Sequence, residues 1–224
     1  MVILAVVFII LSQNPNAVFD LTRLEERLTT SQSDPDAIMR ALRPYLSNPL
    51  VIFGGLALLS GFVPLIEEFF KPLAVWLLKG KILTPAEGFA TGVLAGSGFA
   101  LIESLGQVGA FNGTGWLVLE IGRGGTDLLH IFTAGMMGWA LVNAWKNGKV
   151  WLLGLVYLAA IITHGMWNAL VLGIGLTPFM NFSPSSLLLT QQLGIFAPFG
   201  LGILFILMMV FFLRFNHSLQ NKNL

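Results

Sequence analysis

The chain of 224 residues contains no cysteine, which excludes disulfide bridges, a thiolate nucleophile and any cysteine-ligated metal. It is also poor in charge, since only 10% of its residues are Asp, Glu, Lys or Arg. The 12 basic residues nearly balance the 11 acidic ones, and a net charge of +1 gives no indication of a nucleic acid as partner. Any metal must therefore be bound by His, carboxylate or amide groups.

Apolar residues make up 55% of the sequence, and the mean hydropathy is +0.80. This composition lies far outside that of a soluble globular domain. The sequence therefore predicts an all-α fold in a lipid bilayer, a polytopic transmembrane helix bundle. No internal repeat or low-complexity tract divides it, which indicates one membrane domain.

Five apolar stretches are long enough to cross a hydrocarbon core of roughly 30 Å, which takes about 20 helical residues. They cover residues 50–78, 86–110, 126–145, 150–173 and 194–213. The first is longer than a bilayer requires, and its glycines and prolines predict one long interrupted helix, with a re-entrant pair as the alternative. The short stretch 116–121, ahead of the third span, is expected near the membrane interface.

Residues 1–11 contain an apolar run too short to span alone. It fits the remnant of a longer helix, the core of a signal peptide or a short anchor. Because no small-residue cleavage site follows it, we favour a truncated or short N-terminal helix. Residues 12–48 are polar and are expected to form a solvated extracytoplasmic segment. A transmembrane catalytic domain over 49–214 and a cytoplasmic tail over 215–224 complete the expected organisation.

Basic residues between the spans predict the orientation. They lie in alternate connections and after the last span: Lys79 and Lys81, Lys146 and Lys149, and Arg214 and Lys222. The connection over 174–193 has no Lys or Arg. The alternation places the basic segments in the cytoplasm and residues 12–48 outside, in a multi-pass protein of the cell membrane.

Several ionisable side chains lie inside the expected spans, where a charge costs at least about 2.5–3.5 kcal/mol. They are Glu67, Glu68, Lys71, Glu103, His130 and His164, and the amide of Asn168 accompanies them. Lys71 has helical spacing from both Glu67 and Glu68, and His164 shares a helix face with Asn168. Counted from the basic connections, most of these groups lie roughly 16–22 Å deep, and Glu103, at about 25 Å, joins them only if its helix tilts or starts late. Such groups are tolerated only if they face one another, which predicts one shared site.

This set of side chains can supply what peptide hydrolysis needs, namely a base for water and donors for the oxyanion. Two adjacent carboxylates in a dry site cannot both ionise cheaply. One of Glu67 and Glu68 is therefore expected to be neutral, while the other, supported by Lys71, activates water. His164 or Asn168 would donate to the oxyanion.

A divalent metal is the alternative way to activate water. His130, His164 and Glu103 could hold it with one position open, and zinc fits such ligands best. The motif HExxH is absent from the sequence. The ligands would therefore have to come from different helices, and water activated by glutamate alone stays open.

Four motifs in successive spans resemble the PrsW family of bacterial intramembrane proteases, which is related to the CAAX prenyl endopeptidases and the bacteriocin-immunity proteins. The motifs are Glu67-Glu68-x-x-Lys71, Phe99-x-x-x-Glu103, a single His130, and His164-x-x-x-Asn168. The resemblance implies active-site roles for both adjacent glutamates, Glu103 and the two histidines, and often a metal. It also implies cleavage of a membrane protein, in the named family member an anti-sigma factor. The prenyl endopeptidases have His where this chain has Glu103, so their catalytic scheme does not transfer whole.

The sequence thus predicts an intramembrane protease that acts on a membrane-embedded or membrane-proximal protein. A proton- or ion-coupled transporter is one alternative, because Glu and His chains in a bundle suit it equally, although no inverted repeat is visible. A non-catalytic membrane scaffold is another. Arg123 and Asp127 are expected to form a local salt bridge, and the glycines of GVLAGSG and AGMMG are expected to permit close helix packing.

Overall fold

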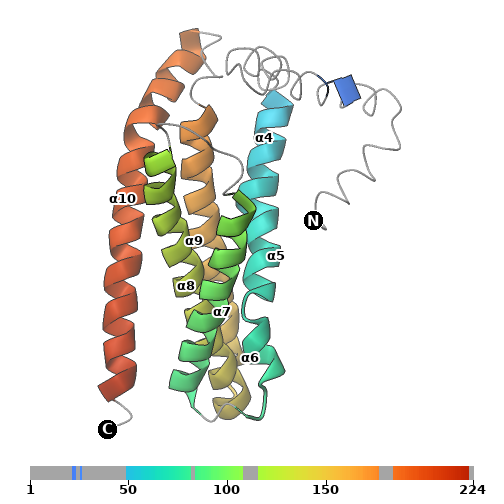
Figure 1. Cartoon of the computed structure of the whole chain (residues 1–224), viewed down its shortest axis with the longest axis vertical. Helices are drawn as coiled ribbons and strands as arrows, with labels where there is room; N and C mark the ends of the chain where they lie inside the picture. The colour runs from blue at the N-terminus through green and yellow to red at the C-terminus, as the bar shows by residue number, and fades with distance from the viewer. Residues whose placement is uncertain are drawn as a thin grey trace.

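The computed structural model describes residues 22–23, 26, 49–81, 84–107, 116–176 and 184–221. The elements named over these residues are all helical: α4 (Pro49–Ala57), the π-helical turn η1 (Leu58–Phe62), α5 (Val63–Phe70), α6 (Leu73–Leu77), α7 (Pro85–Gln107), α8 (Trp116–Asn147), α9 (Val150–Leu176) and α10 (Pro184–Asn221). They form five helical segments long and apolar enough to cross a membrane, which confirms the predicted all-α bundle (Figure 1). The predicted segment 1–11, and all but three residues of 12–48, lie outside the described residues.

The first span is one interrupted helix, as the sequence predicts. α4, η1 and α5 follow one another without a gap, and in η1 the N–H of Val63 bonds the carbonyl of Leu58, five residues back. Pro64 comes next and has no N–H to continue this pattern. Pro72, with φ −79° and ψ 20°, then takes the chain out of the helical region before α6. Two prolines thus bracket the turns of α5 that carry the adjacent glutamates.

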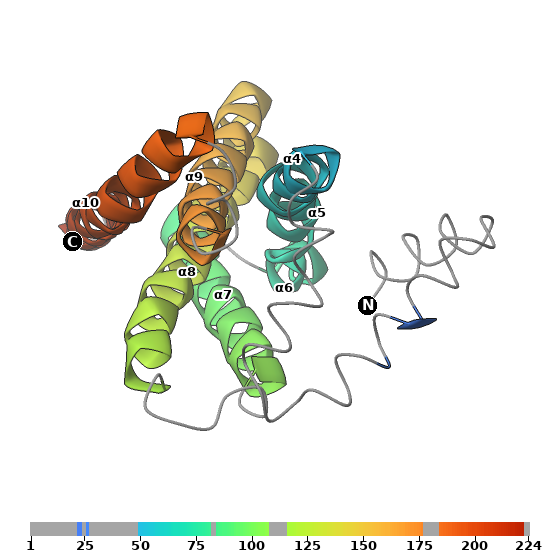
Figure 2. The ribbon, with the colours of Figure 1, turned by 90° about the horizontal axis from the view of Figure 1, so that it is seen from above.

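α8 is the central helix of the bundle. It packs against α6, α7, α9 and α10, and Figure 2 shows it between α7 on one side and α9 and α10 on the other. Its span is 67% buried, whereas the other four spans are 11–28% buried and leave apolar faces for lipid. The stretch 116–121, expected near the membrane interface, forms the first turns of α8.

Glycines bring α7 and α8 into backbone contact, which confirms the predicted close packing. Gly88, Gly92 and Gly96 recur every four residues along α7. A Cβ on Gly92 would collide with the carbonyl of Ala134, and one on Gly96 would collide with the carbonyl of His130. Small residues at this spacing permit such approach between membrane helices. The glycine stripe therefore determines how His130 is placed against α7.

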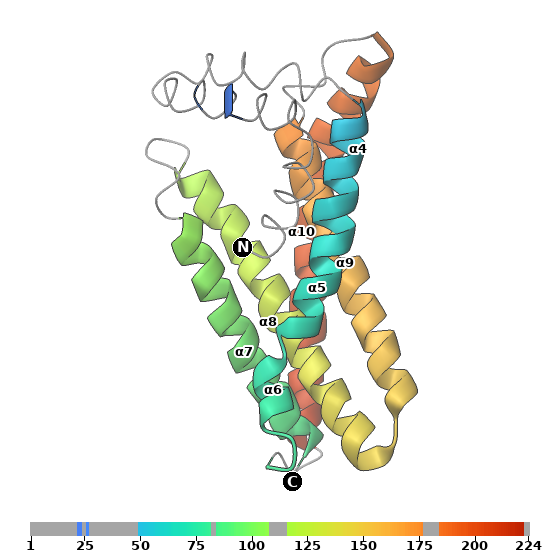
Figure 3. The same cartoon turned by 90° about the vertical axis from the view of Figure 1, so that its right-hand side faces the viewer.

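A capping box begins α7. The N–H of Thr84 donates to Glu87 Oε2 at 2.8 Å, and the N–H of Glu87 donates to Thr84 Oγ1 at 3.2 Å. The helix starts at Pro85, close to the predicted residue 86, so a late start does not bring Glu103 to the site. Figure 3 shows α7 inclined with respect to α5, which is the tilt that the sequence left as the alternative.

Candidate active site

The structure gathers six of the seven predicted site residues into one cluster, called here the Glu/His cluster. Its members are Glu67 and Glu68 of α5, Lys71 just after α5, Glu103 of α7, His130 of α8 and His164 of α9. Four separate helical segments therefore converge at this point within the membrane-spanning part of the chain.

Glu68 is the most enclosed acid of the Glu/His cluster, with 0% of its surface exposed. Its Oε1 accepts hydrogen bonds from Lys71 Nζ at 2.5 Å and from His164 Nδ1 at 2.7 Å. A carboxylate buried in this way needs such partners, because an unpaired charge away from water is very costly. Glu68 is thus hydrogen-bonded to Lys71 and His164 and is inaccessible to solvent.

Glu67 has different surroundings, because successive residues point in different directions around a helix. Its side chain is 28% exposed, and its Oε2 lies 3.8 Å from His164 Nε2 and 3.9 Å from Lys71 Nζ. Neither distance is that of a hydrogen bond. Glu67 therefore faces the cluster without the short hydrogen bonds that hold Glu68.

His130 and Glu103 form the second close pair. His130 Nε2 lies 2.6 Å from Glu103 Oε2, and the Glu103 side chain is 35% exposed. The ring of Phe99, one turn before Glu103, packs edge-on to His130 with 5.0 Å between centroids and also lies 5.2 Å from Lys71 Nζ. His130 itself is 1% exposed, and its Nδ1 has no hydrogen-bond partner among the described residues.

Glu67, His130 and His164 each offer one ligand atom, and these atoms all lie within 4.8 Å of one another. The carboxylate in this group is Glu67, whereas the sequence favoured Glu103, which instead pairs with His130 Nε2. Each histidine has one nitrogen held closely by a carboxylate, Nε2 of His130 by Glu103 and Nδ1 of His164 by Glu68. Of the other two nitrogens, Nδ1 of His130 has no hydrogen-bond partner among the described residues, and Nε2 of His164 lies 3.8 Å from Glu67 Oε2. Metal-ligating histidines commonly have their second nitrogen held by a carboxylate in this way. The donor set therefore fits a divalent ion.

Asn168 lies apart from the Glu/His cluster. Its Nδ2 donates to the carbonyl of Leu59 at 2.9 Å. In the five-residue pattern of η1 that carbonyl would accept from residue 64, but Pro64 has no N–H. Asn168 thus supplies the donor that the proline lacks, and a role for its amide at an oxyanion stays a prediction.

Arg123 and Asp127 form the expected contact, with Nη2 and Oδ1 3.8 Å apart. Ser104 was not singled out from the sequence, and its Oγ accepts hydrogen bonds from Arg123 Nε at 3.1 Å and Nη2 at 2.7 Å. The sequence reasoning also missed Tyr157, whose hydroxyl donates to the carbonyl of Leu65 at 2.6 Å and ties α9 to α5. The feature of the sequence that could have pointed to Ser104 is its position directly after Glu103.

A bundle of spanning helices around buried carboxylates and imidazoles defines a polytopic membrane protein with the side chains of a hydrolase. A family model described as PrsW family intramembrane metalloprotease matches residues 41–215, and the chain therefore belongs to this family. It is a membrane protease by family, as the resemblance implied. No match was found among the curated proteins or among the solved structures.

Proposed function

We propose that the chain hydrolyses a peptide bond of a membrane-embedded or membrane-proximal protein at a centre formed by Glu67, His130 and His164. The observation that carries this proposal is the convergence of three ligand-type side chains from three helices within 4.8 Å. Their enclosure in a membrane-spanning bundle supports a substrate that is itself in the membrane. Family membership supports the reaction class.

The metal is zinc in this proposal, held by Glu67, His130 and His164. Two imidazoles and one carboxylate suit zinc and leave a further position open, and a chain without cysteine has no sulfur ligand to offer. The buried, unpartnered Nδ1 of His130 supports this assignment, since such an atom calls for a partner. Zinc, when bound, polarises the scissile carbonyl and favours deprotonation of water.

The other members of the cluster position these ligands. Glu68 holds the His164 ring through Nδ1, and Lys71 compensates the Glu68 charge. Glu103 holds the His130 ring through Nε2, on the far side of the ring from the proposed ligand atom Nδ1, and so acts through His130 and not as the base for water. Glu68, although predicted as a candidate base, is too enclosed for this role.

The bond that is cut lies in the outer half of the membrane in this proposal. His130 is about 25 Å from the α8 end at Asn147 and about 10 Å from Arg123, at 1.5 Å per residue. The basic residues predict that the Asn147 end is cytoplasmic. Regulated cleavage of an anti-sigma-type factor, as the family resemblance implies, is consistent with this depth.

The test is cleavage of co-expressed single-span membrane proteins, with metal analysis of each purified enzyme. Glu67→Gln and His164→Ala should lose both cleavage and bound zinc, whereas Glu103→Gln should keep zinc at saturating metal and lose turnover. Lys81→Gln, at an exposed position outside the cluster, is the matched control. Full cleavage by Glu67→Gln, or full zinc content in both ligand variants, would overturn the assignment.

A further inference from the structure

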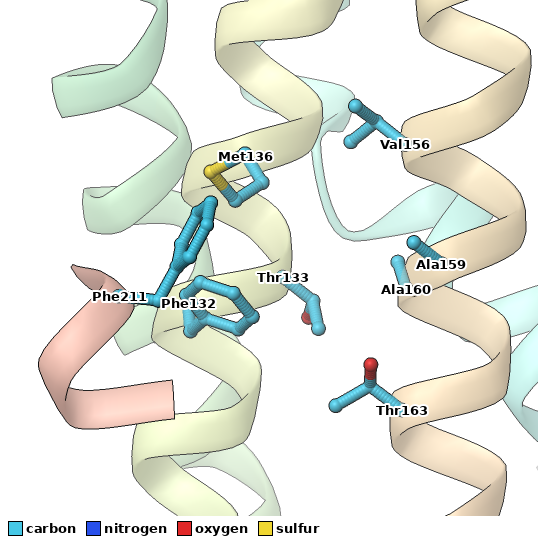
Figure 4. Close-up of a pocket in the computed structure, with 8 residues that line it drawn as sticks. All are labelled: Phe132, Thr133, Met136, Val156, Ala159, Ala160, Thr163 and Phe211. Carbon is cyan, nitrogen blue, oxygen red and sulfur yellow. The ribbon is translucent and has the colours of Figure 1, made fainter. Parts of the chain in front are cut away.

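A half-open cavity of about 250 Å³ lies between α8, α9 and α10 (Figure 4). Most of its lining is apolar, as with Phe132 of α8 and Phe211 of α10. Two threonines also line it: Thr133 is one turn beyond His130, and Thr163 directly precedes His164. The cavity therefore borders the backbone turns that carry both histidines.

Thr133 brings a polar atom into this apolar setting. The residue is 1% exposed, and its Oγ1 has no hydrogen-bond partner among the described residues. Figure 4 shows Thr133 and Thr163 projecting from α8 and α9 into the space between the two helices. Buried hydroxyls in native proteins are bonded to protein or to water. The cavity thus calls for an occupant that can form a hydrogen bond.

The position of the cavity limits what that occupant can be. Thr133 is about 21 Å from the end of α8, and Thr163 about 20 Å from the start of α9, at 1.5 Å per residue. A lipid headgroup does not reach this depth, and an acyl chain offers no hydrogen bond. Water can form a hydrogen bond with the threonine hydroxyls, and the cavity has room for several water molecules at roughly 30 Å³ each. Val156, which also lines it, is only about 9 Å from the start of α9, so the cavity extends toward that interface.

We propose that this cavity is a binding site for water, the co-substrate of the hydrolysis, with Thr133 and Thr163 holding it beside the two histidines. The inference rests on the proposed function, because peptide hydrolysis adds the hydroxyl of water to the carbonyl carbon and its remaining proton, by way of a base, to the leaving amine as the C–N bond breaks.

Reactivity of introduced cysteines tests for water without any assay of proteolysis. The chain has no cysteine, and a thiol reacts with iodoacetamide only as the thiolate, which needs water. Ala160→Cys lines the cavity, Leu158→Cys on the same helix is 54% exposed toward lipid, and Lys149→Cys in the α8–α9 turn gives the solvent reference. We expect Ala160→Cys in liposomes to react at least tenfold faster than Leu158→Cys. Equal rates would overturn the proposal and assign the cavity to lipid chains. Should Ala160→Cys not fold, Val156→Cys takes its place.

Thr133→Val tests whether the water serves catalysis. The two side chains have the same shape, and the hydroxyl that is removed has no protein partner, so thermal stability and zinc content should be unchanged or higher. We expect kcat to fall fivefold or more at unchanged KM, with Thr133→Ser restoring most of it. Unchanged kcat would overturn the supply role. If wild type cleaves nothing, the proposed function fails, while the cysteine rates still decide whether the cavity holds water.

Discussion

Glu68 and Lys71 form an ion pair from which solvent is excluded, and each charge depends on the other. Glu68→Gln leaves the buried ammonium of Lys71 with only the more distant carboxylate of Glu67, 3.9 Å away, which should lower the free energy of unfolding by about 3 kcal/mol. Adding Lys71→Met removes the stranded charge and should recover most of this loss. Thermal unfolding of the purified variants in one detergent measures both effects. A double variant less stable than Glu68→Gln would contradict the account.

Glu103 holds the ring of His130 through Nε2. Outer carboxylates of this kind orient metal ligands, and their loss typically weakens metal binding about 10–100-fold. Glu103→Gln should therefore weaken zinc binding by that factor, which competition with a chelator measures. Glu87→Gln is the matched control on α7, because glutamine preserves the capping box. Equal zinc affinity in wild type and Glu103→Gln would remove Glu103 from the metal centre.

The sequence was enough to predict which carboxylates cluster at one depth in the membrane. It was not enough to predict the role of each carboxylate in the cluster. Depth within the spans depends on residue counts, so the sequence could bring Glu67, Glu68 and the two histidines to one level. The directions of side chains depend on the rotation of each helix about its own axis, which a count does not fix. For this reason the sequence named Glu103 as the carboxylate of a metal site, whereas the geometry groups Glu67 with the two histidines, and the hydroxyl of Thr133 was missed.

The contact between α7 and α8 is the element on which the His130–Glu103 pair depends. Gly96→Ala would put a methyl group against the carbonyl of His130 and push the two helices apart. We expect Gly96→Ala to lower the thermal stability and to reduce the cleavage rate at least tenfold relative to Gly98→Ala, both measured on the purified variants. Gly98 on the same helix has open space around it, so alanine there should be neutral or stabilise by about 0.5–1 kcal/mol. Equal effects at the two positions would show that the contact does not control the site.

The interruption of the first span between α4 and α5 is a second structural feature that can be tested at the scale of the helices. The sequence predicted the break from its glycines and prolines, but a π-helical register and its partner on α9 depend on tertiary packing. Asn168→Ala should cost about 1 kcal/mol by leaving the carbonyl of Leu59 unpaired. In a Pro64→Ala background the new backbone N–H of residue 64 can bond the carbonyl of Leu59. Asn168→Ala should then change the free energy of unfolding only slightly. Unfolding of the four variants of this cycle gives the coupling, and simple additivity would contradict it.

At the scale of the whole molecule, the connections rich in Lys and Arg lie at one end of the bundle. The end of α6, the start of α7, the α8–α9 turn and the end of α10 are together at that end (Figures 1 and 3). Five spans with an alternating course produce this arrangement. It agrees with the spans read from the sequence, and the excess of basic residues at that end predicts that it is cytoplasmic.

Orientation decides on which side of the membrane a substrate meets the Glu/His cluster, and the chain without cysteine allows a direct test. Lys149→Cys marks the α8–α9 turn, and Asn112→Cys marks the connection between α7 and α8. In intact cells a membrane-impermeant maleimide should label Asn112→Cys and leave Lys149→Cys unlabelled until the membrane is opened, because basic connections stay in the cytoplasm. The reverse pattern would invert the bundle. The Glu/His cluster would then lie closer to the cytoplasmic face, and the substrates to screen would be those with a cytoplasmic cleavage site.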